Sequence, residues 1–126
     1  MFQSKEKRHV VLIVEDELLI RMDAVDIVGG AGFDVVDAAN ADEAILILER
    51  RLDISVVFTD IQMPGSMDGL KLAVAIRGRW PPVKIMATSG LREICTDELP
   101  SGSHFLPKPY SRSQIVGALR ELTRDI

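Results

Sequence analysis

The sequence has 126 residues, which is the size of one ordinary domain, and its 47% hydrophobic and 27% charged residues can build a core rather than a disordered chain. A formal net charge of −4 argues against a nucleic-acid-binding surface. Because Cys95 is the only cysteine, an intrachain disulfide is excluded, and no apolar run is long enough to span a membrane. We therefore expect a charged tail over residues 1–8 and one cytoplasmic domain over residues 9–126.

The first half of the chain alternates strands with helices. Residues 9–14 are apolar and β-branched, which is typical of a strand buried on both faces. A helix is predicted from residue 18 until Gly29, Gly30 and Gly32 stop it. Its apolar positions recur at helical spacing, at Leu19, Met22, Val25, Ile27 and Val28. Residues 33–38 predict a second strand, Asn40 can cap a helix running through Leu52, and residues 54–60 predict a third strand ending in Asp60.

The second half continues the alternation. Residues 69–79 predict a helix that ends at Trp80-Pro81-Pro82, and residues 83–89 predict a fourth strand. Residues 91–99 can form at most a short helix, and residues 103–106 predict a brief fifth strand. Ser111 can cap a final helix that places Ile115, Val116, Leu119 and Leu122 on one face.

Five strands alternating with five helices indicate an α/β fold with a doubly wound parallel sheet, because parallel neighbours need crossover connections. The natural strand order is 2-1-3-4-5. In such a sheet, ligands bind beyond the carboxyl ends of the strands, at the switch point between strands 1 and 3.

Polar residues follow four of the predicted strands at this edge. Glu15 and Asp16 follow the first strand, Asp60 ends the third, Ser89 ends the fourth, and Lys108 follows the fifth. Carboxylates about 6 Å apart repel by roughly 3 kcal/mol per pair at an effective dielectric constant near 20, so this cluster favours a bound divalent cation such as Mg²⁺. Each segment alone is also typical of an ordinary loop, turn or strand end; their combination indicates one site.

Together, these residues resemble the receiver domain of two-component response regulators. The resemblance covers about residues 9–124 and rests on Glu15-Asp16, Asp60-Ile61-Gln62-Met63-Pro64, Asp68-Gly69, Ser89-Gly90 and Lys108-Pro109. It implies a flavodoxin-like (βα)5 fold and a phosphoprotein that signals in a phosphorelay. One departure is an additional residue in the segment from Pro64 to Asp68.

The resemblance also implies a role for each site residue. Asp60 would accept a phosphoryl group from a histidine kinase or a histidine phosphotransfer protein. Asp16 and Asp60 would bind Mg²⁺ directly, Glu15 through a water molecule, and Gln62 through its backbone carbonyl. Lys108 would neutralise charge on the transferring group.

A hydroxyl and an aromatic residue would form the conformational switch. Ser89 is preferred over Thr88 for the hydroxyl, because alternation groups Ser89 with Ile85 and Ala87 and because Gly90 supplies a small successor. Phe105 would be the aromatic switch residue, and the alternative is an ordinary core phenylalanine.

Two other function classes stay open. The chain could be a phosphorylation-independent interaction module on the same fold, or a flavin-binding module, although Glu15-Asp16-Glu17 would repel a flavin phosphate. We expect no independent enzyme activity beyond Mg²⁺-dependent self-phosphorylation and autodephosphorylation. Output would pass to a downstream protein partner, and a homodimer stays open.

Overall fold

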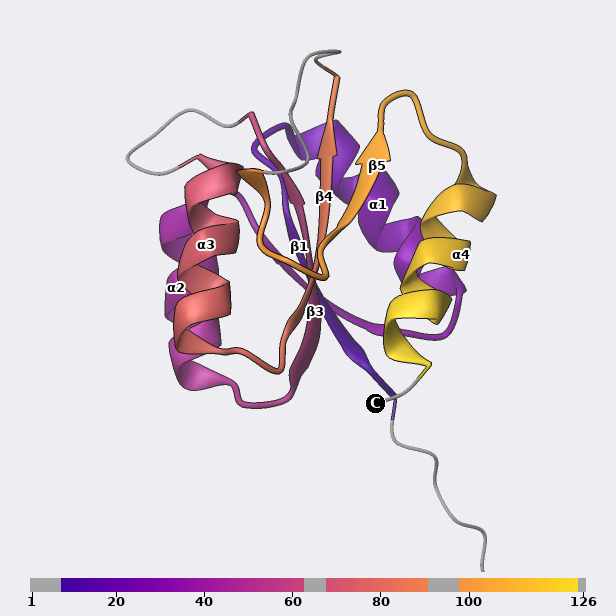
Figure 1. The fold of residues 1–126 in the computed structure, drawn as a ribbon. Coiled ribbons are helices and arrows are strands. Elements are labelled where there is room, and N and C mark those ends of the chain that lie inside the picture. Colours follow the sequence, from indigo (N-terminus) through magenta and orange to yellow (C-terminus); the bar gives the residue numbers. More distant parts are fainter. Residues whose placement is uncertain (1–7, 63–67, 91–97, 125–126) are drawn as a thin grey trace, which may run out of the picture.

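The computed structural model describes residues 8–62, 68–90 and 98–124 (Figure 1). Its strands form one parallel sheet in the order β2-β1-β3-β4-β5, which confirms the predicted α/β fold and strand order. The strands are β1 (Val10–Val14), β2 (Asp34–Ala38), β3 (Ile54–Asp60), β4 (Lys84–Ser89) and β5 (His104–Pro107). The helices are α1 (Leu18–Gly30), α2 (Ala41–Arg50), α3 (Gly69–Arg79) and α4 (Arg112–Thr123).

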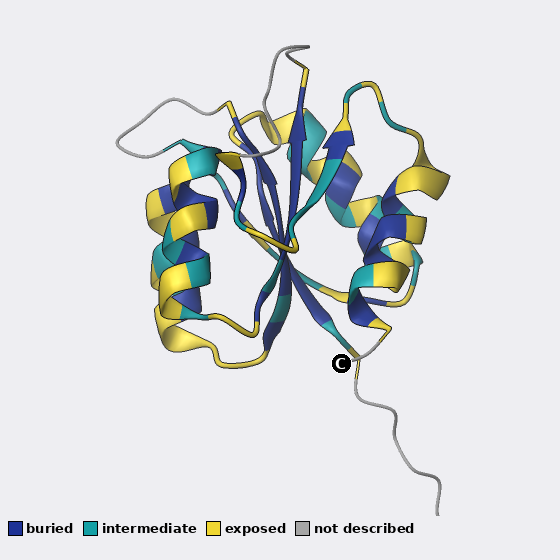
Figure 2. Ribbon diagram, viewed as in Figure 1, coloured by how far each residue is buried: buried dark blue, intermediate teal, exposed yellow. Residues whose placement is uncertain are grey.

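Helices cover both faces of the sheet. Helices α2 and α3 lie on one face, and α1 and α4 lie on the other (Figure 1). The central strands are therefore buried on both sides, as Figure 2 shows, which explains why β1 and β3 read as continuous apolar runs. The short helix predicted over residues 91–99 falls almost entirely outside the described residues.

Three helices begin at capping side chains, and the sequence predicted two of these caps, Asn40 and Ser111. Asn40, Asp68 and Ser111 each accept a hydrogen bond from the backbone N–H three residues later, and Ser111 forms a full capping box with Gln114. Helix α3 ends at Arg79, before Pro81 and Pro82, as the sequence predicts. Within the described residues, no helix has the length and apolar character needed to cross a bilayer.

Helix α1 buries only some of the apolar residues that recur at helical spacing. Leu19 is 79% exposed and Met22 is 54% exposed, whereas Ala24 and Val28 are buried. Apolar residues lie nearly all around this helix, so the pattern alone does not select a face. Packing against the sheet selects the face with Ala24 and Val28, which lie four residues apart on one side of the helix.

Candidate functional site

Strand alternation decides which side chains share the carboxyl edge of the sheet. The core between the sheet and helices α1 and α4 contains residues from four strands, and the last of these along each strand are Ile13, Phe58, Met86 and Leu106. Two positions further along the chain from each of these lie Glu15, Asp60, Thr88 and Lys108. Because side chains alternate along strands, these four residues lie on the same side of the sheet.

Asp60 is the centre of this group. It is only 7% exposed, and its Oδ2 atom lies 2.7 Å from Nζ of Lys108. Its Oδ1 atom accepts a hydrogen bond of 3.0 Å from the backbone N–H of Gln62. Burial alone would lower the pKa of Lys108, but the hydrogen bond and charge of Asp60 outweigh it, so the pKa is raised. The lysine therefore remains a positively charged partner of the carboxylate.

Glu15 is a second buried carboxyl group at this edge. It is 5% exposed, and its Oε2 atom accepts a hydrogen bond of 3.0 Å from the backbone N–H of Glu17. The pKa of Glu15 is raised to about 7, mainly by burial and also by Asp16 and Asp60. The Glu17 N–H and the charge of Lys108 only partly offset this rise. Ionising Glu15 near neutral pH is therefore costly without a nearby cation.

This raised pKa predicts how stability changes with pH in the metal-free protein. At pH values between the ordinary pKa of glutamate and about 7, Glu15 is protonated in the folded protein but ionised in the unfolded chain. The contribution of Glu15 to the free energy of unfolding therefore falls as the pH rises through this range. Because solvent screens the rim of the site, we expect Glu15 to lower the free energy of unfolding by about 1–2 kcal/mol over this range. Thermal unfolding in EDTA between about pH 5 and pH 8 measures this decrease.

Two variants isolate this contribution. Glu15→Gln should remove it, so that the variant gains stability relative to the parent as pH rises. Glu121→Gln, an exposed acid on α4 paired with Arg124, should leave the pH dependence unchanged. Parallel curves for the parent and Glu15→Gln would contradict the assignment.

The donor set at this edge suits Mg²⁺. Glu15 and the exposed Asp16 directly follow β1, and Asp60 ends the adjacent strand β3, so their carboxylate oxygens are candidate ligands at one edge of the sheet. Within the described residues, no group of three or more His, Cys, Asp or Glu side chains is arranged to hold a metal ion by itself. Mg²⁺ keeps several waters and needs only one or two protein carboxylates, and it is on this chemistry of the ligands that the fit rests.

The two candidate switch hydroxyls lie on opposite sides of β4. Thr88 is the register partner of Asp60, and its Oγ1 atom is buried without a hydrogen-bond partner in the described part of the chain. Ser89 instead alternates with Ile85 and Ala87, and its Oγ atom donates a hydrogen bond of 2.9 Å to Oε1 of Gln62. The alternation that favoured Ser89 in the sequence therefore places it on the side away from Asp60.

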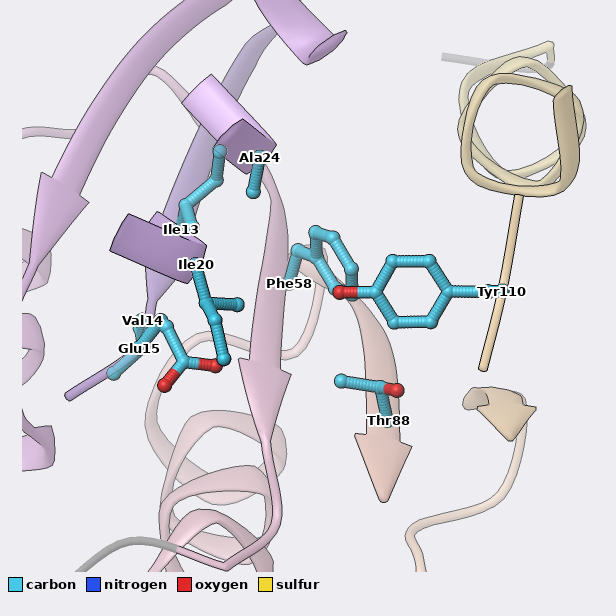
Figure 3. A pocket seen from close by; sticks show the side chains of 8 residues that line it. All are labelled: Ile13, Val14, Glu15, Ile20, Ala24, Phe58, Thr88 and Tyr110. Atoms are coloured by element: carbon cyan, nitrogen blue, oxygen red, sulfur yellow. The ribbon is translucent and has the colours of Figure 1, made fainter. Parts of the chain in front are cut away.

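A small cavity of about 10 Å³ adjoins the site (Figure 3). Its lining includes Glu15, Thr88 and Tyr110. The hydroxyl of Tyr110 points toward the cavity, and its ring packs against Phe58 with the ring centroids 6.1 Å apart. Burial raises the pKa of Tyr110. Sequence reasoning missed this residue, although its position directly after Lys108-Pro109 is a signal that could have found it.

Phe105 lies on the other side of the sheet from Asp60. It is partly buried against the core under α2 and α3, and it is the register partner of Ala87. Its predicted part in a switch stays a prediction.

Comparison with known proteins gives a consistent result. Residues 11–120 match the family model described as the response regulator receiver domain. The chain is 35% identical over 116 residues to the sensor kinase CckA of Brucella abortus. The aligned region covers 89% of this chain and 12% of that protein. It is 31% identical to the transcriptional regulatory protein PdtaR of Mycobacterium tuberculosis, in an aligned region that covers 86% of this chain and 54% of the regulator. The chain thus spans only about an eighth to a half of these relatives.

Solved structures agree with the sequence matches. A response regulator receiver protein from Sinorhizobium medicae has a TM-score of 0.85 and 26% identity, covering 92% of this chain and 94% of that one. The CheX–CheY–BeF3–Mg²⁺ complex from Borrelia burgdorferi has a TM-score of 0.81 and 27% identity, covering 90% of this chain and 88% of that one.

Proposed function

Because the chain belongs to the response regulator receiver domain family, we propose that it accepts a phosphoryl group on Asp60 from a histidine kinase or a histidine phosphotransfer protein. The observation that carries the proposal is the environment of Asp60. Its buried carboxylate is oriented by the Gln62 N–H and paired with Lys108, and the buried Glu15 directly follows the adjacent strand β1.

In the proposed reaction, a carboxylate oxygen of Asp60 bonds to the phosphorus atom as the P–N bond to the donor imidazole breaks. The departing nitrogen keeps the electron pair, and an acyl phosphate forms. Lys108 already contacts Oδ2 and is placed to neutralise charge on the transferred oxygens. Catalysis here consists mainly of positioning and of charge stabilisation.

Mg²⁺ is the cofactor that we propose for this step, and receiver domains generally bind it. Asp16 and Asp60 would hold the ion directly, Glu15 through a water molecule, and Gln62 through its backbone carbonyl. When bound, the ion supplies positive charge that offsets the buried carboxylates and the phosphoryl oxygens.

The proposal is tested by incubating the purified chain with acetyl phosphate and Mg²⁺, and measuring the intact mass. We expect the added mass of one phosphoryl group with Mg²⁺ and none in EDTA. A protein that binds Mg²⁺ but gains no mass would instead indicate a phosphorylation-independent interaction module.

We further propose that Thr88, rather than the initially preferred Ser89, donates its hydroxyl to the phosphoryl oxygen. Thr88 is the register partner of Asp60 and its hydroxyl has no hydrogen-bond partner among the described residues, whereas Ser89 already donates to Gln62. A new hydrogen bond would therefore satisfy a buried polar atom. The resulting movement at the end of β4 would reach Phe105 and signal to a downstream protein.

Matched alanine variants separate the two hydroxyls. Thr88→Ala should remove most of the amide chemical-shift changes that phosphorylation produces in β4 and β5, while Asp60 is still labelled. Ser89→Ala should preserve those changes, because the Ser89 hydroxyl donates to Gln62 and lies on the side of β4 away from Asp60. The reverse result would restore Ser89 as the switch hydroxyl.

A further inference from the structure

Arg21, in the first turn of α1, joins three elements near the proposed metal site. Its Nη1 atom donates a hydrogen bond of 2.8 Å to the backbone carbonyl of Glu15, which follows β1. Its Nε atom lies 3.0 Å from Oδ2 of Asp37 on β2. The Arg21 side chain is only 15% exposed, so the guanidinium is fixed between its partners rather than free in solvent.

The contact with Arg21 completes the restraint of Glu15. The backbone N–H of Glu15 donates to the carbonyl of Ala38 at 3.1 Å, and its carboxylate accepts from the Glu17 N–H. The carbonyl of Glu15 is fixed by Arg21. This carbonyl belongs to the peptide that joins Glu15 to Asp16, so Arg21 holds the peptide between the two acidic residues.

We propose that Arg21 is a positioning residue that keeps Glu15 and Asp16 in the orientation needed to bind Mg²⁺. This inference rests on the proposed function, because it assumes that the acidic pair binds the ion. Arg21 would contact neither the ion nor the phosphoryl group. It would act through the main chain of Glu15, as residues behind metal ligands commonly do.

A second effect of Arg21 has the opposite sign. A positive charge beside an acidic site weakens cation binding, so removing Arg21 could tighten it. However, Asp37 lies 3.0 Å from the guanidinium and cancels much of its field, and salt screens the rest over about 8 Å at physiological ionic strength. We therefore expect the loss of positioning to dominate.

The chain offers a matched control at the other end of β2. Arg8 also bridges backbone carbonyls and an aspartate, since it donates to Gly32 and Phe33 and pairs with Asp34 at 3.2 Å. Asp34 begins β2 at the amino edge of the sheet, whereas the acidic pair follows β1 at the carboxyl edge. Arg8→Met therefore removes the same kind of contacts away from the site.

The test is a Mg²⁺ titration of the full chain, followed by amide chemical shifts, at physiological ionic strength. We expect Arg21→Met to bind Mg²⁺ about tenfold more weakly than the parent. Arg21→Lys should fall between them, because a lysine keeps the charge but lacks the planar fork that reaches both acceptors. Arg8→Met should bind like the parent. Thermal unfolding of each variant reports any general loss of stability separately.

A metal-free measurement tests the same idea. In EDTA, the amide of Glu17, which donates to the Glu15 carboxylate, should exchange with solvent faster in Arg21→Met than in Arg8→Met. Equal or tighter Mg²⁺ binding by Arg21→Met would overturn the inference and leave the proposed function standing. A parent protein that does not bind Mg²⁺ would instead overturn the proposed function.

Discussion

Asp60→Asn is expected to abolish labelling by acetyl phosphate in the presence of Mg²⁺. An amide is a far weaker nucleophile than a carboxylate, and its uncharged oxygen is a poorer Mg²⁺ ligand and a poorer partner for Lys108. The shape of the side chain is almost unchanged, so the fold should persist. Intact-mass measurement of the parent and the variant under the same conditions gives the result directly.

Asp53→Asn is the matched control for this substitution. Asp53 precedes the amino end of β3, whereas Asp60 ends the same strand, and it is an exposed residue paired with Arg51. This variant should be labelled like the parent. Undiminished labelling of Asp60→Asn would show that another residue accepts the phosphoryl group and would refute the assignment.

Gly69→Ala is expected to destabilise the protein by about 3 kcal/mol, which lowers the melting temperature by about 10 °C. Gly69 begins α3, and its N–H donates to the carbonyl of Ile61 at 2.9 Å. A Cβ atom here would collide with the carbonyl oxygen of Asp60 and lie 2.7 Å from Cα of Ile61. Backbone atoms cannot rotate aside as a side-chain end can, so α3 or the end of β3 must move.

The same displacement should slow phosphoryl labelling, because it moves the main chain of the acceptor. Gly78→Ala, in the same helix, is the control: apart from its chain neighbours and the backbone of its own helix, no heavy atom of the described residues lies within 4 Å of the added Cβ. Replacing a helical glycine with alanine at such a position should stabilise the protein by about 0.5–1 kcal/mol. A melting temperature for Gly69→Ala at or above that of the parent would show that the end of β3 adapts at little cost.

Local sequence patterns predicted the architecture because each element carries its own signal. Strands buried on both faces must be continuously apolar, and Asn40, Asp68 and Ser111 cap helices through contacts only three residues away. The acidic pair, Asp60 and Lys108 could be assigned to one edge before any coordinates, because parallel strands bring their carboxyl ends together. The 2.7 Å contact between Lys108 and Asp60 agrees with that expectation.

The sequence by itself thus determined the sheet, its order and the composition of the polar edge. Only the tertiary structure decided which side of the sheet each residue occupies: Thr88 beside Asp60, Ser89 away from it, and the buried face of α1 at Ala24 and Val28. It also decided the close approach of Gly69 to Asp60 and the bridge from Arg21 to Glu15. These features depend on register and packing between distant segments, whereas a periodic pattern records only that a residue is buried.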